Sequence, residues 1–429
     1  MMSAARTLVS RLEALQCHFT WDLDLRRSLL LRCRDNLIDI GTDNGNKWLG
    51  HIYNLRGFIQ YKLGSNEDAQ SFFNKATEAF SQIKNTDEGP WLVVNYGNLA
   101  WLHHHLGDQA ESEAYLSKVD ALNKKYPSPS QEELHPEIYA EKAYTLMTFN
   151  GDMNLVADYF QRAIEMQPDM VEWNSWHVIA LTYVSNYSLE DDIFQKMRIA
   201  QEQDPENLYL AAHYLCQRAK RGERVKDEAR QLATIVLRSP VGSYSGLKPL
   251  LWVYRQRYDE AIDLAEEALT NHPDERYLKR RAALCYQKKL LCSNSPLTKS
   301  MIARAVSLHQ EVIALYPDSS LMRKIHLAAI YARTSHDGQA KAEQIYQELL
   351  KSDLEPAGQQ VLFNSYAKYL HFQKQDRKMS IRYHMEAAKI QHQSFFRKDS
   401  IKVLEIIRDK GWHRMCGEIR ECLANLQEP

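Results

Sequence analysis

Apolar residues recur along almost the whole chain at the i, i+3, i+4 spacing that places them on one face of an α-helix. Runs of β-branched residues are few, and the 429 residues include only 16 glycines. The pattern therefore predicts an all-α protein. A chain of this length is either two or three ordinary domains or one long array of repeats.

The spacing of the prolines favours the repeat array. Five prolines in the middle of the chain are spaced at intervals of 37, 35, 33 and 44 residues: Pro168, Pro205, Pro240, Pro273 and Pro317. Ala163, Ala200 and Ala268 each stand five residues before one of these prolines. A period in the mid-thirties is typical of helix-pair repeats, and the tetratricopeptide repeat (TPR) of about 34 residues has alanine and proline at fixed offsets.

A nearly complete repeat core occurs closer to the N-terminus, in Gly57, Gly64, Ala69, Phe73 and Ala76. Small residues allow two helices to cross closely, large ones fill the space between pairs, and proline ends the second helix. Roughly nine such units fit between residues 48 and 393. We therefore predict a superhelical TPR solenoid with a central channel.

We expect the array to be divided into five segments. They are an N-terminal helical cap (1–47), an N-terminal TPR subdomain (48–130), central repeats with a basic inner wall (131–290), C-terminal repeats (291–393) and a C-terminal helix (394–429). The Pro- and Ser-rich stretch 126–136 is either a bend between two subdomains or a long loop between helices.

The cysteines and the N-terminus indicate a cellular compartment. The seven cysteines form no C-x-x-C pair, and an odd number does not suit a disulfide framework. The N-terminal residues lack the apolar core of a signal peptide, and no apolar run is long enough to cross a bilayer. We expect a reduced, soluble, cytoplasmic protein that does not associate with membranes.

Charge is balanced overall but not locally. The formal net charge is -1, so no global field attracts nucleic acid. Residues 215–290, however, contain 16 Lys and Arg against 10 Asp and Glu, an excess of six positive charges. This excess either faces solvent on the outside of the array or lines the inner wall.

The register of the repeat favours the inner wall for part of this excess. Lys248 and Arg255 are seven residues apart, two helical turns, so they share a face. Tyr209, Tyr277 and Arg280 occupy matching positions in neighbouring repeats. Cations interleaved with aromatic rings suit single-stranded nucleic acid, because cations neutralise phosphates and rings stack on bases. The predicted RNA-binding residues are Tyr209, Lys248, Tyr254, Arg255, Tyr277, Arg280 and Arg281.

Candidate catalytic and metal sites are not supported. Cys17 and His18 are adjacent, but nothing elsewhere completes a nucleophilic or metal set around them. The consecutive histidines 103–105 project about 100° apart on a helix and do not converge on one ion. We predict no catalytic residue, no metal ligand and no cofactor, and we expect Phe19 and Trp21 to cap the first repeat.

The stretch CHFTW (Cys17 to Trp21), followed about thirty residues later by IYNLRGFIQYKLG and then by helix-pair repeats, resembles the interferon-induced proteins with tetratricopeptide repeats. The longer run WLGHIYNLRGFIQYKLG looks most like the fish members. The resemblance covers most of the chain. It implies a cytosolic, interferon-inducible antiviral protein of innate immunity.

The resemblance also implies a site. Several family members hold the 5′ end of foreign single-stranded RNA in a central basic channel and block its translation without acting on it chemically. The family's channel positions fall on Tyr209, Lys248, Arg255, Arg280 and Arg281. The aromatic residue that stacks on a cap base in cap-binding members falls on Tyr144. Positions that contact the 5′ phosphates fall on uncharged residues, namely Asn36, Ile40, Thr148 and Tyr183.

Two functions from different classes follow. The first is sequestration of viral RNA with a 5′-triphosphate or incompletely methylated cap, in a channel built from repeats. The alternative is a non-catalytic scaffold that joins other family members or immune signalling proteins, with weak or no RNA binding. The expected partners are thus the 5′ end of single-stranded viral RNA, relatives or signalling proteins, and further copies in a homo- or hetero-oligomer.

Overall fold

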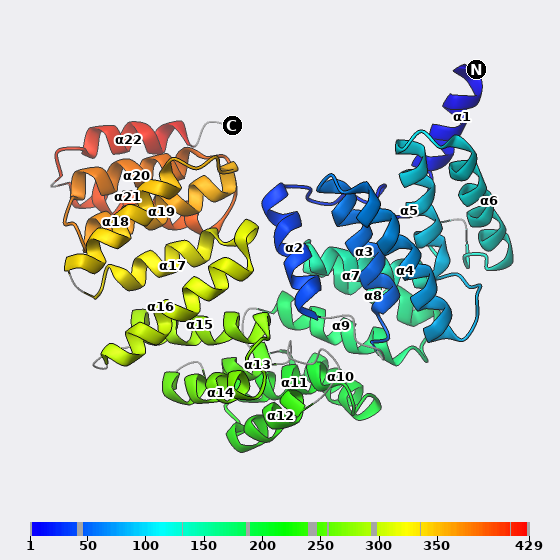
Figure 1. Cartoon of the computed structure of the whole chain (residues 1–429), viewed down its shortest axis with the longest axis horizontal. Helices are drawn as coiled ribbons and strands as arrows, with labels where there is room; N and C mark the ends of the chain where they lie inside the picture. Colours follow the sequence, from blue (N-terminus) through cyan, green and yellow to red (C-terminus); the bar gives the residue numbers. More distant parts are fainter. Residues whose placement is uncertain are drawn as a thin grey trace. The chain divides into compact units, whose positions relative to one another are not determined.

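The computed structural model describes residues 2–40, 46–130, 132–185, 189–238, 247–254, 257–292, 298–334, 336–411 and 413–426. Every regular element within these ranges is a helix (Figure 1). The chain forms two compact units, Met1–Gln256 and Arg257–Pro429, called here the N-terminal and C-terminal units. The predicted all-α fold is confirmed.

The helices of the N-terminal unit are α1 (Met2–Glu13), α2 (Arg27–Ile40), α3 (Leu49–Lys62), α4 (Asn66–Lys84), α5 (Leu92–His105), α6 (Gln109–Lys125), α7 (Pro136–Thr148), α8 (Met153–Met166), α9 (Val171–Val184), α10 (Asp191–Gln203), α11 (Leu208–Lys220), α12 (Lys226–Arg238) and α13 (Leu247–Val253). Those of the C-terminal unit are α14 (Tyr258–Asn271), α15 (Arg276–Cys292), α16 (Lys299–Leu315), the short 3-10 helix η2 (Pro317–Ser319), α17 (Leu321–Tyr331), α18 (His336–Leu350), α19 (Pro356–Phe372), α20 (Arg377–Lys389), α21 (Phe395–Lys410) and α22 (Cys416–Asn425).

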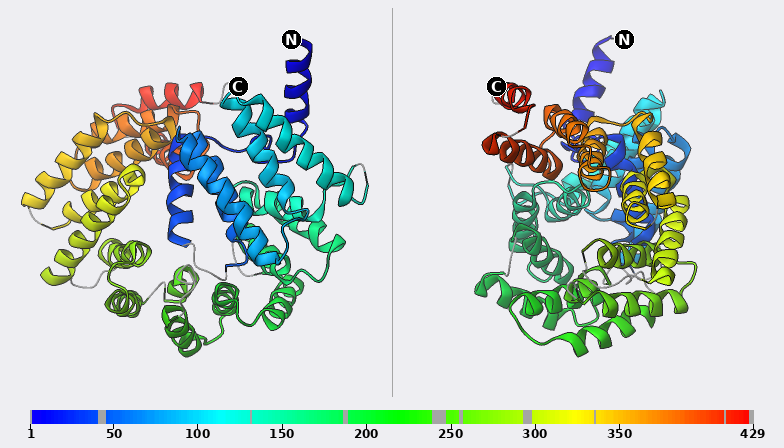
Figure 2. Two further views of the ribbon diagram at one scale, coloured as in Figure 1. Left: turned by 45° about the vertical axis from the view of Figure 1, so that its right-hand side comes forward. Right: turned by 90° about the vertical axis from the view of Figure 1, so that its left-hand side faces the viewer.

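Consecutive helices pack as antiparallel pairs, from α3 with α4 to α19 with α20, and the pairs follow one another along each unit (Figure 2). The first helices of successive pairs also touch. In the N-terminal unit α7 contacts α9, α9 contacts α11 and α11 contacts α13, and in the C-terminal unit α15 contacts α17. Residues on first helices therefore share one layer in each unit, which is the arrangement that the repeat register predicts.

Gly57 shows why the small residues of the repeat are needed. A Cβ added to Gly57 would lie 2.7 Å from the ring of Phe73, closer than side-chain atoms approach one another. Phe73 is fully buried between α3 and α4, together with Ala69 and Ala76. A single glycine thus allows the two helices to cross closely enough to enclose a phenylalanine.

The CHFTW stretch is part of the core. The His18 side chain is buried and hydrogen-bonds through one ring nitrogen to Asn98 (2.9 Å) and through the other to Thr145 (3.1 Å). Phe19 stacks on Trp101 with ring centroids 6.0 Å apart. Burial raises the pKa of the Cys17 thiol to about 12 and lowers the pKa of His18 to about 3, so neither group is poised for chemistry.

Two expectations about chain organisation are resolved. Residues on either side of the 126–136 stretch, such as Leu122 and Ile138, belong to the same hydrophobic core. The stretch is therefore a long loop between α6 and α7.

The prediction of a single C-terminal helix over 394–429 is wrong. Helix α21 ends at Lys410, because the next residue, Gly411, has a φ of +68°, the left-handed conformation that terminates a helix. A second helix, α22, follows.

The division into two units does not coincide with any predicted segment boundary. The first unit ends at Gln256, inside the segment predicted for 131–290. Helix α13 packs on α11 and α12 in the N-terminal unit, whereas α14 packs on α15 in the C-terminal unit. The predicted site residues are thus divided between the units, and the five-segment division stays a prediction.

Candidate nucleic-acid interface

A row of rings crosses the first helices of the N-terminal unit. It runs from Trp48, just before α3, to Tyr144 on α7, Trp176 on α9, and Tyr209 and His213 on α11. Successive ring centroids are 5.0, 5.5, 5.7 and 4.7 Å apart. We call this set the aromatic row. Sequence reasoning identified two of its members, Tyr144 and Tyr209, and missed the others.

The exposed end of the row carries a cation. Tyr183 on α9 is 41% exposed, and its hydroxyl lies 3.4 Å from that of Tyr209. The Nζ atom of the exposed Lys248, on α13, lies 5.7 Å from the centroid of the Tyr183 ring. We call Tyr183, Tyr209, His213 and Lys248 the lysine–tyrosine site. An open ring beside an ammonium group can stack on a base and contact a phosphate.

His213 is the buried member of this site. It is 7% exposed, and its Nε2 atom has no hydrogen-bond partner within the described residues. Its pKa is lowered to about 3 by burial and by the positive charges of Lys248 and Lys220. The imidazole is therefore neutral at physiological pH, and the local potential is positive.

Two of the predicted binding tyrosines are core residues. Tyr144 is 4% exposed, because it is stacked on Trp48 and lies edge-on to Trp176. Tyr254 is also 4% exposed, and its hydroxyl donates to the backbone oxygen of Lys226 at 3.0 Å. Neither ring presents a free face to a base. The family resemblance predicted Tyr144 and the repeat register predicted Tyr254, and the packing of the neighbouring helices buries both rings.

The remaining predicted RNA-binding residues of this group are Arg255, Tyr277, Arg280 and Arg281. Arg255 lies outside the described residues. Tyr277 is 5% exposed and therefore also a core residue, whereas Arg280 and Arg281, next to it on α15, are half-buried. The guanidinium carbon of Arg281 lies 4.6 Å from the Tyr277 ring centroid. The structure thus groups the three predicted residues of the C-terminal unit, with the arginines covering the tyrosine.

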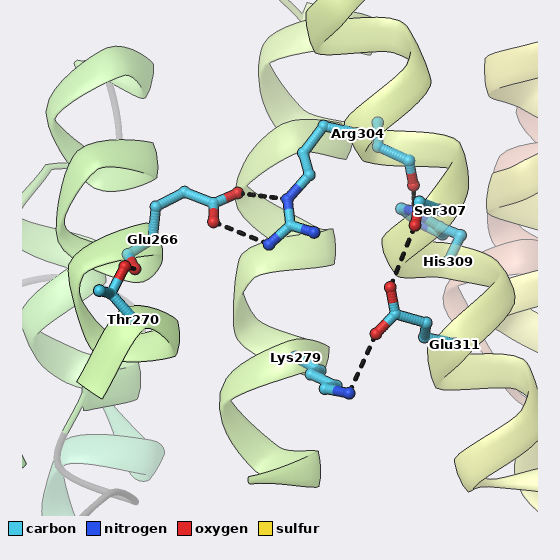
Figure 3. Close-up of polar contacts among 8 residues, drawn as sticks. Glu266, Thr270, Lys279, Arg304, Ser307, His309 and Glu311 are labelled. Carbon is cyan, nitrogen blue, oxygen red and sulfur yellow. Dashed lines mark hydrogen bonds and ion pairs between the residues drawn. The ribbon is translucent and has the colours of Figure 1, made fainter. Parts of the chain in front are cut away.

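Ion pairs link α16 to both of its preceding helices, α14 and α15 (Figure 3). Arg304 on α16 makes two hydrogen bonds of 2.8 Å to the carboxylate of Glu266 on α14. Lys279 on α15 pairs with Glu311 on α16 at 3.0 Å, and Ser307 donates to the same carboxylate at 3.0 Å. The hydrogen bond from Arg304 holds the pKa of Glu266 below its usual value. These two cations are therefore neutralised by partners.

The four positions at which the family resemblance implies contacts with 5′ phosphates carry no cation. Asn36 and Ile40, on α2, are half-buried, and Ile40 packs against the hydrophobic core. The Thr148 hydroxyl donates to the backbone oxygen of Tyr144 at 2.9 Å. Tyr183 contributes a ring instead of a charge. These four positions therefore offer one exposed ring and no cation, and Lys248 lies beside that ring.

A sequence signal for the missed residues existed. Trp176 and Tyr183 are seven residues apart, the same two-turn spacing that identified Lys248 and Arg255. Applied to α9, that rule would have placed both rings on one face of this helix.

Within the described residues, no group of three His, Cys, Asp or Glu side chains is arranged to hold a metal ion. No helix in these ranges is long and apolar enough to span a bilayer.

Comparisons with known proteins agree with this architecture. A family model described as "Tetratricopeptide repeat" matches residues 48–122. The human protein "Antiviral innate immune response effector IFIT1" is 24% identical over 419 residues, covering 92% of this chain and 86% of its own length. Human "Interferon-induced protein with tetratricopeptide repeats 2" is 26% identical over 406 residues, covering 90% of this chain and 84% of its own.

Solved structures share the fold. "Human IFIT1 dimer with m7Gppp-AAAA" matches with a TM-score of 0.69 at 22% identity and covers 98% of this chain and 96% of its own. "Human IFIT1 dimer with PPP-AAAA" matches with a TM-score of 0.67 at the same identity, covering 98% of this chain and 94% of its own. Over most of its length the chain is thus similar to the interferon-induced proteins with tetratricopeptide repeats, as the CHFTW stretch and the repeats after it predict.

Proposed function

We propose that the protein is a cytoplasmic antiviral effector of innate immunity that binds foreign single-stranded RNA on the first-helix layer and thereby blocks its translation. It acts by sequestration and carries out no catalysis. The observation that carries the proposal is the lysine–tyrosine site, where an exposed ring lies beneath an exposed ammonium group at 5.7 Å.

The physical chemistry of this site suits a single strand. Stacking of a base on an exposed aromatic ring contributes about 1–3 kcal/mol and tolerates any base. Lys248 supplies the charge that attracts the neighbouring phosphate. Trp48 and Tyr144, at one end of the aromatic row, are both buried, so we assign base stacking to Tyr183 and Tyr209.

The relatives support the same ligand class. The structures matched above are of human IFIT1 with m7Gppp-AAAA and with PPP-AAAA, both short RNAs with defined 5′ ends. Arg255, Arg280 and Arg281 remain predicted RNA contacts. Tyr144 is already stacked on Trp48, so a cap base would have to displace one of these rings. We therefore propose 5′-triphosphate RNA rather than capped RNA as the ligand.

The proposal is tested by RNA binding to the full chain across a salt series. Lys248→Glu should weaken binding about tenfold or more and reduce the slope of log affinity against log salt by about 1. The matched control is Lys118→Glu, because Lys118 is also exposed and lies 4.4 Å from the Tyr115 ring, but on the second helix α6. Equal RNA affinity in wild type and Lys248→Glu would overturn the proposal.

A second candidate function, a protein-interaction scaffold, is favoured by a different surface. Phe372 and Phe395 in the C-terminal unit are 70% and 69% exposed, and Nζ of Lys368 lies 6.0 Å from the Phe395 ring. Exposed phenylalanines are enriched at protein interfaces. Loss of nuclease-resistant binding to a purified relative in the Phe372→Ser, Phe395→Ser variant, with RNA affinity unchanged, would establish this function.

A further inference from the structure

Helix α21, in the C-terminal unit, exposes one continuous row of side chains. Its members follow one another at intervals of three or four residues, which places them on one face of the helix. They are Phe395, Lys398, Lys402 and Ile406, and we call them the α21 row. Phe395 is 69% and Ile406 is 45% exposed, and both lysines are exposed as well. The row thus has an apolar residue at each end and two cations between them.

The opposite face of α21 holds this row towards solvent. Leu404 and Ser400 are fully buried, and the Ser400 hydroxyl accepts a hydrogen bond of 2.8 Å from Asn364 on α19. The Nε atom of Arg397 donates to the backbone oxygen of Ala388 on α20 at 2.9 Å. These contacts lie on the far side of the helix from the row, so rotating the row inwards would break them.

The positive charges of the row are not used within the fold. Neither of its lysines forms a hydrogen bond or an ion pair with another described residue. The acidic side chains of the same helix are placed elsewhere. Asp399 pairs with Lys368 of α19 at 2.9 Å, whereas Asp409 pairs with Arg408 at 2.8 Å. Glu405 is half-buried. The row therefore presents two cations that a ligand can pair.

Helix α19, which contacts α21, extends the apolar part of this surface. The Nζ atom of Lys368 lies 6.0 Å from the centroid of the Phe395 ring. Phe372 follows Lys368 by about one helical turn and is 70% exposed. A partner bound along the α21 row can therefore also bury apolar surface on α19.

The order of residues along the row distinguishes between classes of ligand. A single strand of RNA needs exposed rings in succession, and Ile406 offers no ring. A membrane surface takes up an apolar face with cations along its edges, whereas here the lysines lie between the apolar residues. Apolar anchors at the two ends of a straight row, about 16 Å apart, match one side of a second helix.

We propose that the α21 row binds an acidic amphipathic α-helix of a partner protein. The partner helix would present carboxylates about one turn apart to Lys398 and Lys402, and apolar side chains to Phe395 and Ile406. Burial of the apolar ends supplies affinity, and the charges fix register and orientation. This inference rests on the protein-interaction function proposed above, whose partner it specifies, and it does not depend on RNA binding.

The test titrates a fluorescent synthetic peptide with the full chain and follows the anisotropy of the peptide. The peptide is an amphipathic helix of about four turns, with two glutamates one turn apart between two leucines. The Lys398→Glu, Lys402→Glu double variant should bind it about tenfold or more weakly, because two attractions become repulsions. The same variant should bind a peptide in which lysines replace the glutamates, a reciprocal gain that misfolding cannot produce.

The matched control is the Lys378→Glu, Arg382→Glu double variant. It makes the same change of net charge at exposed residues of α20, outside the row, and should alter affinity less than about twofold. Phe395→Ser should weaken binding of the acidic peptide about tenfold, because an apolar anchor is lost. Equal affinity of wild type and the row variant for the acidic peptide, or absence of binding to wild type, would overturn the proposal.

A second arm identifies other occupants of the row. If the acidic peptide does not bind but the row variant abolishes self-association in sedimentation, the row is an interface between copies of this chain. If the row variant instead loses a single-stranded RNA oligonucleotide or anionic vesicles, the ligand is RNA or a membrane. If the Phe372→Ser, Phe395→Ser variant loses a purified relative while no acidic peptide binds, the scaffold function stands and this inference is wrong.

Discussion

Lys248 and Tyr183 are 65 residues apart in sequence, and the ammonium nitrogen of the first lies 5.7 Å from the ring centroid of the second. A cation over a ring contributes about 0.5–1 kcal/mol at an exposed site and orients both side chains. We expect the two to act together on RNA. The Lys248→Gln, Tyr183→Ala double variant should lose less affinity than the sum of the single losses. A double-mutant cycle measured by RNA titration checks this, and strict additivity would show that the pair is uncoupled.

Gly57 gives a stability prediction. Gly57→Ala places a methyl group against Phe73 and should lower the free energy of unfolding of the N-terminal unit by about 1–3 kcal/mol. The control is Gly417→Ala in α22, where no atom lies within 4 Å of an added Cβ. That change should be neutral or stabilising by up to about 1 kcal/mol. Urea denaturation followed by circular dichroism compares them, and equal midpoints would contradict the close crossing of α3 and α4.

The thiol groups should differ sharply in reactivity. Burial raises the pKa of Cys17 to about 12, whereas Cys292 is exposed. Brief treatment of the folded protein with iodoacetamide should modify Cys292 and leave Cys17 unmodified until the protein unfolds. Peptide mass spectrometry distinguishes the two. Early modification of Cys17 would contradict the structural role given to the CHFTW stretch.

His18 predicts part of the pH dependence of stability. Its pKa is about 3 in the fold, because burial disfavours the charged ring, and 6.5 when unfolded. Between these values the unfolded chain binds a proton that the folded chain does not, so stability falls as the pH decreases from 6.5 towards 3. His18→Gln should flatten this slope, whatever its effect on stability at pH 7. Unfolding free energies measured from pH 7 to pH 4 test the slope, and identical slopes would refute the assignment.

The sequence predicted the fold better than the site. Helical periodicity and the offsets of Ala163 and Pro168 depend on local packing, and the helix pairs confirm them. How deeply a side chain is buried depends on the neighbouring helices. For this reason Tyr254 and Tyr277 were expected on the inner wall and are found in the core. Trp48 was missed because its stacking on Tyr144 joins segments that are far apart in sequence, which residue spacing alone does not encode.

The stack of Trp48 on Tyr144 sets an upper limit on the number of nucleotides that the N-terminal unit reads. The aromatic row is closed where these two rings cover each other, whereas Trp176 and Tyr209 are half-buried and Tyr183 beside Tyr209 is exposed. Lengthening an oligonucleotide past these rings therefore adds backbone but no new stacking surface in the aromatic row. Its contribution to affinity should reach a plateau at a footprint of very few bases, and this unit should not distinguish a short oligonucleotide from the full-length transcript.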